Sequence, residues 1–467
     1  MFMFKRGVCV LGVIVGALLP ISCGDDGNDN NDEPTATDPQ PVEISFMLWW
    51  NEGGEAEIDR VNEVLQAFND SQDEIVVKSV PVLYDDYVSE IDRRSETNTL
   101  PDAAMMQESR VVSLAIEGKL ADVSDMYDAD NPPLKDVAFT YQGRTVAYSV
   151  ANEVLLLYYN KDMFQAAGVD MPPASAEDAW TWDELVTAAK QLTVDSAGLT
   201  PNDEGFDPDS IVTFGMHYIK RAWFWPEIAS SLGSGGIVSE DGSTLDFAHE
   251  DTITAAQAIA DLALVEHVSP TPDEEADYLD PSIAVNLVEE KVAMVVSGQW
   301  EIGTSLSGQL DNGLNYGVGV LPIMDENSAP VTYNTGGAIV AFNTSNHPEE
   351  TKTFLKWYGQ PENNLAMINS GIWMPILKNW YTDDDLISKW AETSVHPDLE
   401  EYKSAVIDYA LNYSRQVPWY YIPRFDEMES AIESGMEDVW DGTKSAEDVI
   451  SNDIGPGLQS ILDEINQ

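Results

Sequence analysis

The chain has 467 residues, enough for about two or three domains that each bury a core. It carries 82 Asp and Glu against 23 Lys and Arg, and its formal net charge is −59. Because such a surface repels phosphate backbones and anionic lipids, the charge excludes a nucleic-acid-binding role. The acids are spread along the chain and predict a solvated surface that tolerates high salt. A site for a cationic ligand is the alternative, since it needs only a few carboxylates.

Residues 1–22 have the pattern of an export signal. Lys5 and Arg6 precede the apolar run GVCVLGVIVGALLPIS, which is shorter than the ~20 residues that span a membrane. Cys23 ends this run, directly after a small residue. The order resembles the lipobox of bacterial lipoproteins, in which the cysteine becomes the lipidated N-terminus, although Pro20 stands where leucine is usual. The alternative is a simple cleaved signal peptide with an unrelated cysteine.

The segment 23–41 is predicted to be a disordered acidic tether. After Cys23 it reads GDDGNDNNDEPTATDPQP, which is polar, acidic and interrupted by proline. A calcium-binding loop is the alternative, but the regular ligand spacing that ends in Glu is missing. Since the other cysteine, Cys9, lies in the signal, the mature chain has no internal disulfide and Cys23 is best explained as an anchor.

From residue 42 short strands alternate with amphipathic helices. Strands are predicted over 43–48, 74–80 and 101–107, and helices over 55–70, 84–97 and 109–120. This order predicts a parallel, doubly wound sheet, whose ligands lie beyond the carboxyl ends of the strands.

A second α/β unit begins with the buried-strand run NEVLLLYYN at 152–160. The helix over 181–193 opens with a capping box of Thr181 and Glu184. Strands over 211–218 and 291–298, with helices over 252–266 and 282–290, continue the alternation.

Several stretches carry a family resemblance in their order and spacing. They are VNEVLQAFND, LPDAAMM, AIEGKLADVSDM, GRTVAYSVANEVLLLYYNKDMFQAAGV, TWDELVTAAKQLT, EEKVAMVVSGQW, NYGVGVLPI and NTGGAIVAFNTSNHPEETKTFLKWYG. Together they resemble the family 1 extracellular solute-binding proteins, the maltose-binding-protein-like carbohydrate receptors of ABC importers. The resemblance runs from about residue 43 to the C-terminus.

The resemblance implies an α/β, type II periplasmic-binding-protein fold of two lobes, each a mostly parallel sheet flanked by helices, with a ligand cleft between them. The first lobe would comprise 42–150 and 334–372, and the second 151–333 and 373–467. It implies a monomeric receptor without metal or cofactor, which captures a sugar or oligosaccharide and delivers it to the permease and ATPase of an ABC importer. The protein would be exported and held to the outer face of the membrane through its lipid anchor only.

Tryptophans beside turn signals are the candidate sugar platforms, because sugars offer flat apolar faces to aromatic rings. Trp300 ends a Gly-x-Trp that often stacks on sugar in the family. One of Trp49 and Trp50 is expected to line the cleft, with Trp50 favoured because it is nearer the loop, and one of Trp223 and Trp225 likewise. Trp373 lies at a predicted crossover. Packing in the core is the alternative for each of them.

Polar candidates follow predicted strands or stand at the predicted crossovers. They are Tyr84, Asp85, Glu108, Asn152, Glu153, Gly336, Gly337 and Arg424. For the acids the alternative is a stabilising place at a helix N-terminus, for the glycines a turn, and for the arginine a structural ion pair.

Two other classes of function stay open. The chain has no G-x-S-x-G, H-E-x-x-H, C-x-x-C or phosphate-loop motif, and its five histidines are scattered. A carboxylate pair of a glycosidase would nevertheless be invisible in so acidic a sequence. An enzyme would cleave an oligosaccharide that a receptor returns unchanged, and a surface adhesin would bind no small ligand.

The lipobox predicts that Cys23→Ser releases the protein from the membrane fraction of its native host. The reason is that stable anchoring needs the multiply acylated terminus that only this cysteine offers. Fractionation and immunoblotting of parent and variant measure the change. A variant that stays membrane-bound would refute lipidation at Cys23.

Overall fold

The structure, a computed structural model, describes residues 40–50, 55–127 and 129–466. The predicted export signal, the lipidation site Cys23 and nearly all of the predicted tether lie outside these residues. Among the described residues, no helix is both long and apolar enough to span a membrane.

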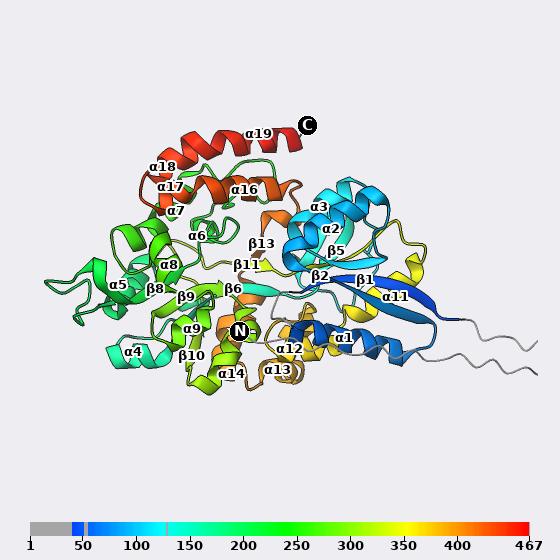
Figure 1. Cartoon of the computed structure of the whole chain (residues 1–467), viewed down its shortest axis with the longest axis horizontal. Helices are drawn as coiled ribbons and strands as arrows, with labels where there is room; N and C mark the ends of the chain where they lie inside the picture. Colours follow the sequence, from blue (N-terminus) through cyan, green and yellow to red (C-terminus); the bar gives the residue numbers. More distant parts are fainter. Residues whose placement is uncertain (1–39, 51–54, 128, 467) are drawn as a thin grey trace, which may run out of the picture. The chain divides into compact units, whose positions relative to one another are not determined.

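The described strands form two sheets, with the first on the right and the second towards the left in Figure 1. In spatial order the first sheet comprises β2 (Ile75–Leu83), β1 (Val42–Trp50), β3 (Ala103–Met106), β12 (Ala338–Ala341), β5 (Arg144–Ser149) and β4 (Ala138–Tyr141). The second comprises β13 (Ser414–Gln416), β11 (Thr332–Thr335), β6 (Glu153–Asn160), β9 (Val292–Gly298), β8 (Ile211–Tyr218) and β7 (Val194–Asp195), with β10 (Tyr316–Gly319) also paired to β6.

Both sheets mix strand directions more than the sequence predicts. In the first, β1 runs parallel to β2 and β3, whereas β12 runs antiparallel to its two neighbours. In the second, β8 and β9 are parallel, but β6 is antiparallel to β9, β10 and β11. Parallel neighbours need a crossover helix. Strands β6 and β12 instead enter directly from the other sheet, so they are free to run in the opposite direction.

Helices cover both sheets, and the last four run along the top of Figure 1. On the side of the first sheet lie α1 (Glu55–Ser71), α2 (Tyr84–Thr97), α3 (Glu108–Ile116), α11 (Pro348–Tyr358), α12 (Leu365–Asn369) and α13 (Asp384–Ala391). Around the second sheet lie α4 (Lys161–Ala167), α5 (Trp182–Leu192), α6 (Glu227–Ser231), α7 (Glu250–Leu264), α8 (Pro272–Tyr278), α9 (Ile283–Val288), α10 (Glu301–Thr304), α14 (Leu399–Tyr402) and α15 (Tyr409–Asn412). The last four are α16 (Phe425–Gly435), α17 (Glu437–Trp440), α18 (Ala446–Asp448) and α19 (Gly455–Ile465).

Aromatic side chains fill the core beneath the first sheet. Phe46 of β1 meets Phe354 and Tyr358 of α11, each with ring centroids 5.2 Å apart. Phe68 of α1 packs edge-on against Phe354 and Trp357. These contacts bury the inner faces of α1 and α11, where most of the hydrophobic stabilisation of such helices arises.

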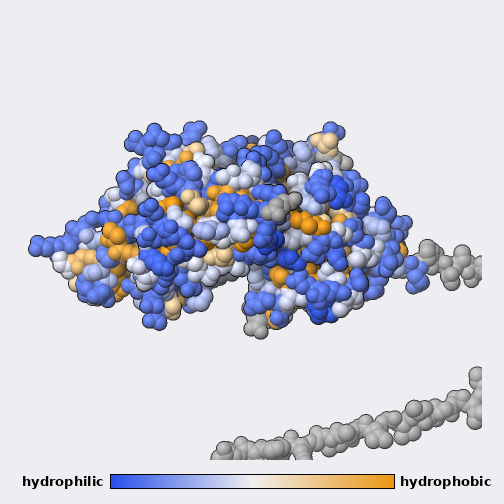
Figure 2. Space-filling model, turned by 90° about the horizontal axis from the view of Figure 1, so that it is seen from above, coloured by the Kyte–Doolittle hydropathy of each residue, from blue (hydrophilic) through white to orange (hydrophobic). Residues whose placement is uncertain are grey.

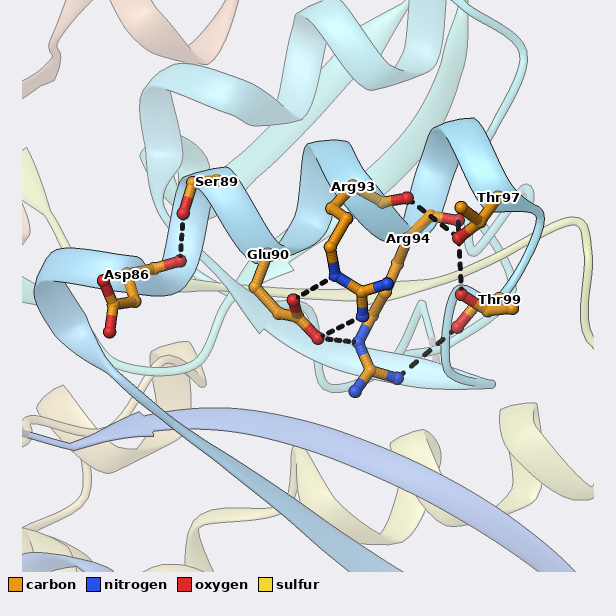
Figure 3. A network of polar contacts seen from close by, with 7 residues as sticks. All are labelled: Asp86, Ser89, Glu90, Arg93, Arg94, Thr97 and Thr99. Carbon is orange, nitrogen blue, oxygen red and sulfur yellow. Dashed lines mark hydrogen bonds and ion pairs between the residues drawn. The ribbon is translucent and has the colours of Figure 1, made fainter.

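A capping box on α5 and a side-chain network on α2 show how local sequence stabilises individual helices. The predicted capping box of α5 is confirmed: the Glu184 carboxylate accepts the Thr181 N–H at 2.8 Å, and the Thr181 hydroxyl accepts the Glu184 N–H. On the outer face of α2, the Glu90 carboxylate accepts bonds from Arg93 and Arg94, both with a shortest distance of 2.6 Å (Figure 3). Tyr84 begins α2, so it lies at the end of the helix away from Arg93 and Arg94.

Most of the face seen in Figure 2 is hydrophilic, and hydrophobic residues appear there as separate patches. This is consistent with the predicted solvated acidic surface, because isolated apolar side chains are normal on soluble proteins.

A buried polar network ties the segments that cross between the sheets. The Asn152 amide donates to the Tyr381 hydroxyl at 2.8 Å and accepts from the Asn334 amide. Tyr420 donates to the Asn334 side chain at 3.0 Å and lies 2.9 Å from the Ser149 hydroxyl. We call these five residues the junction. It joins the crossing at 149–153 to the crossing at 335–338.

Backbone bonds strengthen the same crossings. The Val150 N–H donates to the Gly337 carbonyl at 2.6 Å, and the Asn152 N–H donates to the Met374 carbonyl at 3.0 Å. The segment around Met374 therefore forms a third contact beside the two strand crossings. The implied lobe boundaries stay a prediction; β11, which includes Asn334, pairs with the second sheet rather than the first.

We predict that Asn152→Ala lowers the free energy of unfolding by about 1–3 kcal/mol, because it leaves the buried Asn334 amide without its acceptor. Urea denaturation measures the change. The exposed turn residue Asn202 provides the matched control, Asn202→Ala. Equal midpoints for the two variants would contradict a structural role of the junction.

Candidate functional site

A cavity of about 450 Å³ opens between the two sheets, beside the junction. Its walls combine strand ends, helix starts and crossing segments from both halves of the chain. The lining residues are Trp49, Tyr84, Met105, Gln107, Glu108, Ser109, Val150, Glu153, Arg221, Trp223, Trp300, Thr304, Thr335, Gly337, Ile372, Trp373, Trp419 and Glu429. Five of them are tryptophans.

The first-sheet wall is built on the end of β1. The Trp49 ring packs edge-on against Tyr87, 5.4 Å away, and against Tyr84 at 6.0 Å. Gly337 makes room for this ring, since a Cβ there would come within 2.5 Å of the indole. The indole is thereby fixed in orientation with part of its surface on the cavity.

The second-sheet wall carries a cluster of three tryptophans. Trp223 lies 4.9 Å from Trp419 and 6.3 Å from Trp300, measured between ring centroids. The Trp300 ring folds back over Gly298, where no Cβ would fit. This explains the Gly-x-Trp pattern: the glycine provides the space that the indole occupies.

Three carboxylates and one guanidinium line the cavity. Burial raises the pKa of Glu108, the first residue of α3, to about 7, against backbone hydrogen bonds that lower it. Burial, followed by the charges of Glu433, Glu108 and Asp426, raises the pKa of Glu429 to about 7, while Arg221 lowers it. The cavity therefore holds acids that are partly protonated near neutral pH.

Two buried polar atoms on the wall have no hydrogen-bond partner among the described residues. They are the indole nitrogen of Trp419 and the hydroxyl of Thr335, whose residues are 5% and 2% exposed. Because buried polar groups are nearly always paired, these two unpartnered atoms are unusual features of residues that line the cavity.

Eight of the fourteen predicted ligand-binding residues lie on this cavity: Trp49, Tyr84, Glu108, Glu153, Trp223, Trp300, Gly337 and Trp373. The structure thus brings together residues that are more than 300 positions apart in sequence. Their contact with a ligand remains a proposal.

Trp50, Asp85 and Trp225 do not line the cavity. Trp49 lines the cavity in place of the favoured Trp50. Neighbouring residues of a strand point to opposite faces, and the face, rather than the distance from the loop, determines which indole reaches the cavity. Asp85 is exposed in the first turn of α2. Trp225 is fully buried between Phe247 and Trp440. The open choice between Trp223 and Trp225 is resolved geometrically in favour of Trp223.

Asn152, Gly336 and Arg424 are also not among the lining residues. Asn152 is fully buried in the junction. Gly336 has φ +133°, and a Cβ there would collide with the Ala151 carbonyl, so it serves the turn. Arg424 caps the start of α16 and forms ion pairs with Glu427 at 2.7 Å and Glu464 at 2.8 Å.

Four further residues line the cavity without being among the residues predicted from the sequence: Trp419, Arg221, Thr335 and Glu429. Trp419 stands beside Pro418, so the same rule that selected tryptophans next to turn signals would have found it. Arg221 stands two residues before the predicted Trp223. Thr335 and Glu429 carry no local signal that distinguishes them from other strand or helix residues.

Residues 63–394 match the model of a family described as bacterial extracellular solute-binding protein, well over half of the chain. The chain belongs to this family. Membership of an extracellular family implies that this solute-binding protein is exported. The family resemblance in the sequence is thereby confirmed.

Individual relatives are distant. The solute-binding protein is 25% identical over 317 residues to the sn-glycerol-3-phosphate-binding periplasmic protein of Brucella abortus. That match covers 63% of this chain and 66% of the relative, just under two thirds of its length.

Solved structures show the same fold. An ABC substrate-binding protein from Listeria monocytogenes, in complex with cycloalternan, has a TM-score of 0.71 at 18% identity, covering 91% of this chain and 98% of that one. The GacH receptor of Streptomyces glaucescens, studied with acarbose, has a TM-score of 0.70 at 19% identity, with 90% and 99% covered. The predicted two-lobed α/β fold of this solute-binding protein is confirmed.

The raised pKa values predict how stability depends on pH. A carboxyl whose pKa rises from 4.5 to about 7 on folding binds its proton more tightly in the folded state, so folding loses stability as pH rises between these values. We expect the double variant Glu108→Gln, Glu429→Gln to lose less stability than the parent from pH 5 to pH 8. Between pH 5 and pH 8, the melting temperature of the parent should therefore fall by a few degrees more than that of the variant, on the order expected for 1–2 kcal/mol.

Scanning calorimetry at several pH values measures this difference. The exposed residue Glu447 supplies the control, Glu447→Gln. A difference between parent and double variant that is the same at pH 5 and pH 8 would contradict the raised pKa values.

Proposed function

We propose that this solute-binding protein is the carbohydrate receptor of an ABC importer. The observation that carries the proposal is the cavity itself, which is lined by five tryptophans together with three carboxylates and one guanidinium. Aromatic faces suit the apolar faces of sugar rings, and the carboxylates and the guanidinium of the lining suit sugar hydroxyls.

The wall charges disfavour an anionic ligand such as glycerol phosphate. A phosphate group needs arginine, lysine or free backbone N–H groups. Here Arg221 is the one cationic side chain among the lining residues, which include three acids, and Glu108 already occupies the N-terminal turn of α3 on the cavity. This excess of acids supports a neutral, hydroxyl-bearing ligand over the one named for the Brucella relative.

Closure would bring the two walls onto the ligand. The proposed lobes, 42–150 with 334–372 and 151–333 with 373–467, would move about the junction until Trp49 and the cluster of Trp223, Trp300 and Trp419 hold opposite faces of a sugar. Only the closed state contacts the ligand from both sides, so ligand favours closure. A monomer anchored through Cys23 would then present the closed form to its permease and ATPase partners, without itself altering the ligand.

The test is sugar binding by the full-length protein purified in detergent. The panel contains glucose, maltose, cellobiose, mannose and glycerol-3-phosphate, and calorimetry measures affinity. We expect a sugar to bind and to be recovered unchanged, and glycerol-3-phosphate not to bind. Binding of glycerol-3-phosphate alone would overturn the carbohydrate proposal, and cleavage of a disaccharide would favour the glycosidase alternative.

Adjacent tryptophans give a matched pair for the mechanism. We expect Trp49→Ala to weaken sugar binding by about 1–3 kcal/mol, several-fold to a hundredfold, because it removes an aromatic face from the cavity. Trp50→Ala, one residue away and outside the cavity, should bind like the parent. Trp225→Ala should instead lower stability by ~3–5 kcal/mol through loss of a core indole. Equal affinities for the two neighbouring variants would refute the aromatic-platform mechanism.

A further inference from the structure

Trp419 reaches the cavity from a single 3₁₀ turn, Pro418–Tyr420, which follows β13. Its indole packs against Trp223, with ring centroids 4.9 Å apart and the ring planes at 56°. The same indole meets Phe425 edge-on at 5.8 Å. Trp419 lines the cavity although the residue is only 5% exposed, so its place depends on the backbone that carries it.

The next residue of the turn, Tyr420, is held by the other half of the chain. Its ring stacks on that of Phe139 in β4, with centroids 4.1 Å apart and an angle of 20° between the planes. Both residues are fully buried. The Tyr420 hydroxyl also donates to Asn334 and lies beside the Ser149 hydroxyl of β5. Because adjacent residues share one backbone, the contacts that fix Tyr420 also fix Trp419.

Strand β13, which leads into the turn, is fastened to the same edge of the first sheet. In the strand orders of the two sheets, β4 stands at one end of the first and β13 at one end of the second. The side-chain amide of Gln416 joins them, since its Nε2 donates to the carbonyls of Ala138 at 3.0 Å and Asp136 at 3.2 Å. These two carbonyls occupy both N–H groups of the amide. The turn is therefore attached to the first sheet before and after Trp419.

The turn itself is stiff. Pro418 restricts its own φ, and its carbonyl accepts the N–H groups of Tyr421 at 3.1 Å and Ile422 at 2.8 Å. A stiff turn with two external attachments moves as one body. A change at either attachment is thus passed on to the Trp419 ring and is not absorbed within the turn.

We propose that Phe139 and Gln416 are positioning residues of the carbohydrate site, which hold the turn and thereby fix Trp419 against Trp223 without contacting the ligand. Neither Phe139 nor Gln416 lines the cavity. The inference rests on the proposed carbohydrate function and adds residues that act on the ligand only through Trp419. Their effect on affinity follows because an indole that is already held loses less freedom when a ligand stacks on it.

The first test reads the position of the Trp419 ring without any ligand. Two indoles in contact at a fixed tilt couple their electronic transitions and give a paired band in ultraviolet circular dichroism, which fades when one ring becomes mobile. Subtracting the spectrum of Trp419→Phe from that of the parent isolates the band of this ring. The same subtraction is made in each variant background. We expect Phe139→Leu and Gln416→Met each to lose most of the band.

Each variant has a control that removes the same kind of group elsewhere. Phe46→Leu shortens a fully buried phenylalanine of the first sheet that packs against α11. Gln360→Met removes a partly exposed amide that donates to the Lys356 carbonyl. Both controls should keep the band, even where their melting temperatures fall as far as those of the variants. A band that survives Phe139→Leu or Gln416→Met overturns the role of that residue, and a band lost equally in its control shows general loosening and overturns it too.

The second test measures affinity by calorimetry for glucose, maltose, cellobiose and mannose, on the full-length protein in detergent. We expect Phe139→Leu and Gln416→Met to weaken the sugar that binds the parent by about three- to tenfold, the cost of ordering one side chain on binding. The two controls should bind like the parent. Parent-like affinity in both variants would overturn the positioning role. If none of the four sugars binds the parent, the carbohydrate function fails, while the first test still decides whether Phe139 and Gln416 fix the ring.

Discussion

The cavity depends on the junction, the buried hydrogen-bond network in which Asn152 and Asn334 meet Tyr381 and Tyr420. The chain passes between the sheets in separate crossings, and each brings backbone polar groups into a region closed to water. Such groups must be paired, and here they are paired with one another. The crossings are therefore held in one register, and that register sets where the strand ends of both sheets open on a common space.

Two glycines then determine where the aromatic rings of the cavity can lie. Gly298 and Gly337 leave room for the indoles of Trp300 and Trp49, so each large ring lies flat against backbone rather than projecting freely. A ring fixed in this way loses little further freedom when a ligand stacks on it. The same glycines allow tryptophans that are distant in sequence to line one cavity.

Charge has opposite consequences at the surface and in the cavity. Across the surface, acids are solvated and contribute solubility. Within the cavity, burial raises the pKa of Glu108 and of Glu429 to about 7, which reduces the stability of the folded state near neutral pH. Groups held at a cost to stability are typical of functional sites. The lining holds three carboxylates and one guanidinium, that of Arg221. This excess of acids favours the proposed hydroxyl-bearing ligand over a phosphate-bearing one.

The sequence by itself determined the two α/β units, most of their elements and the capping box of α5, because these follow from local periodicity and capping chemistry. It also indicated that Trp49 and Trp50 would point to opposite faces, because side chains alternate along a strand. Only the tertiary structure decided that Trp49 rather than Trp50 lines the cavity and that Trp225 is core, since this requires knowing which face of each element meets the other half. Asn152 shows the same limit. Its position at a crossing was visible in the sequence, but its partner Asn334 lies 182 positions away, and that pairing exists only once the chain has folded.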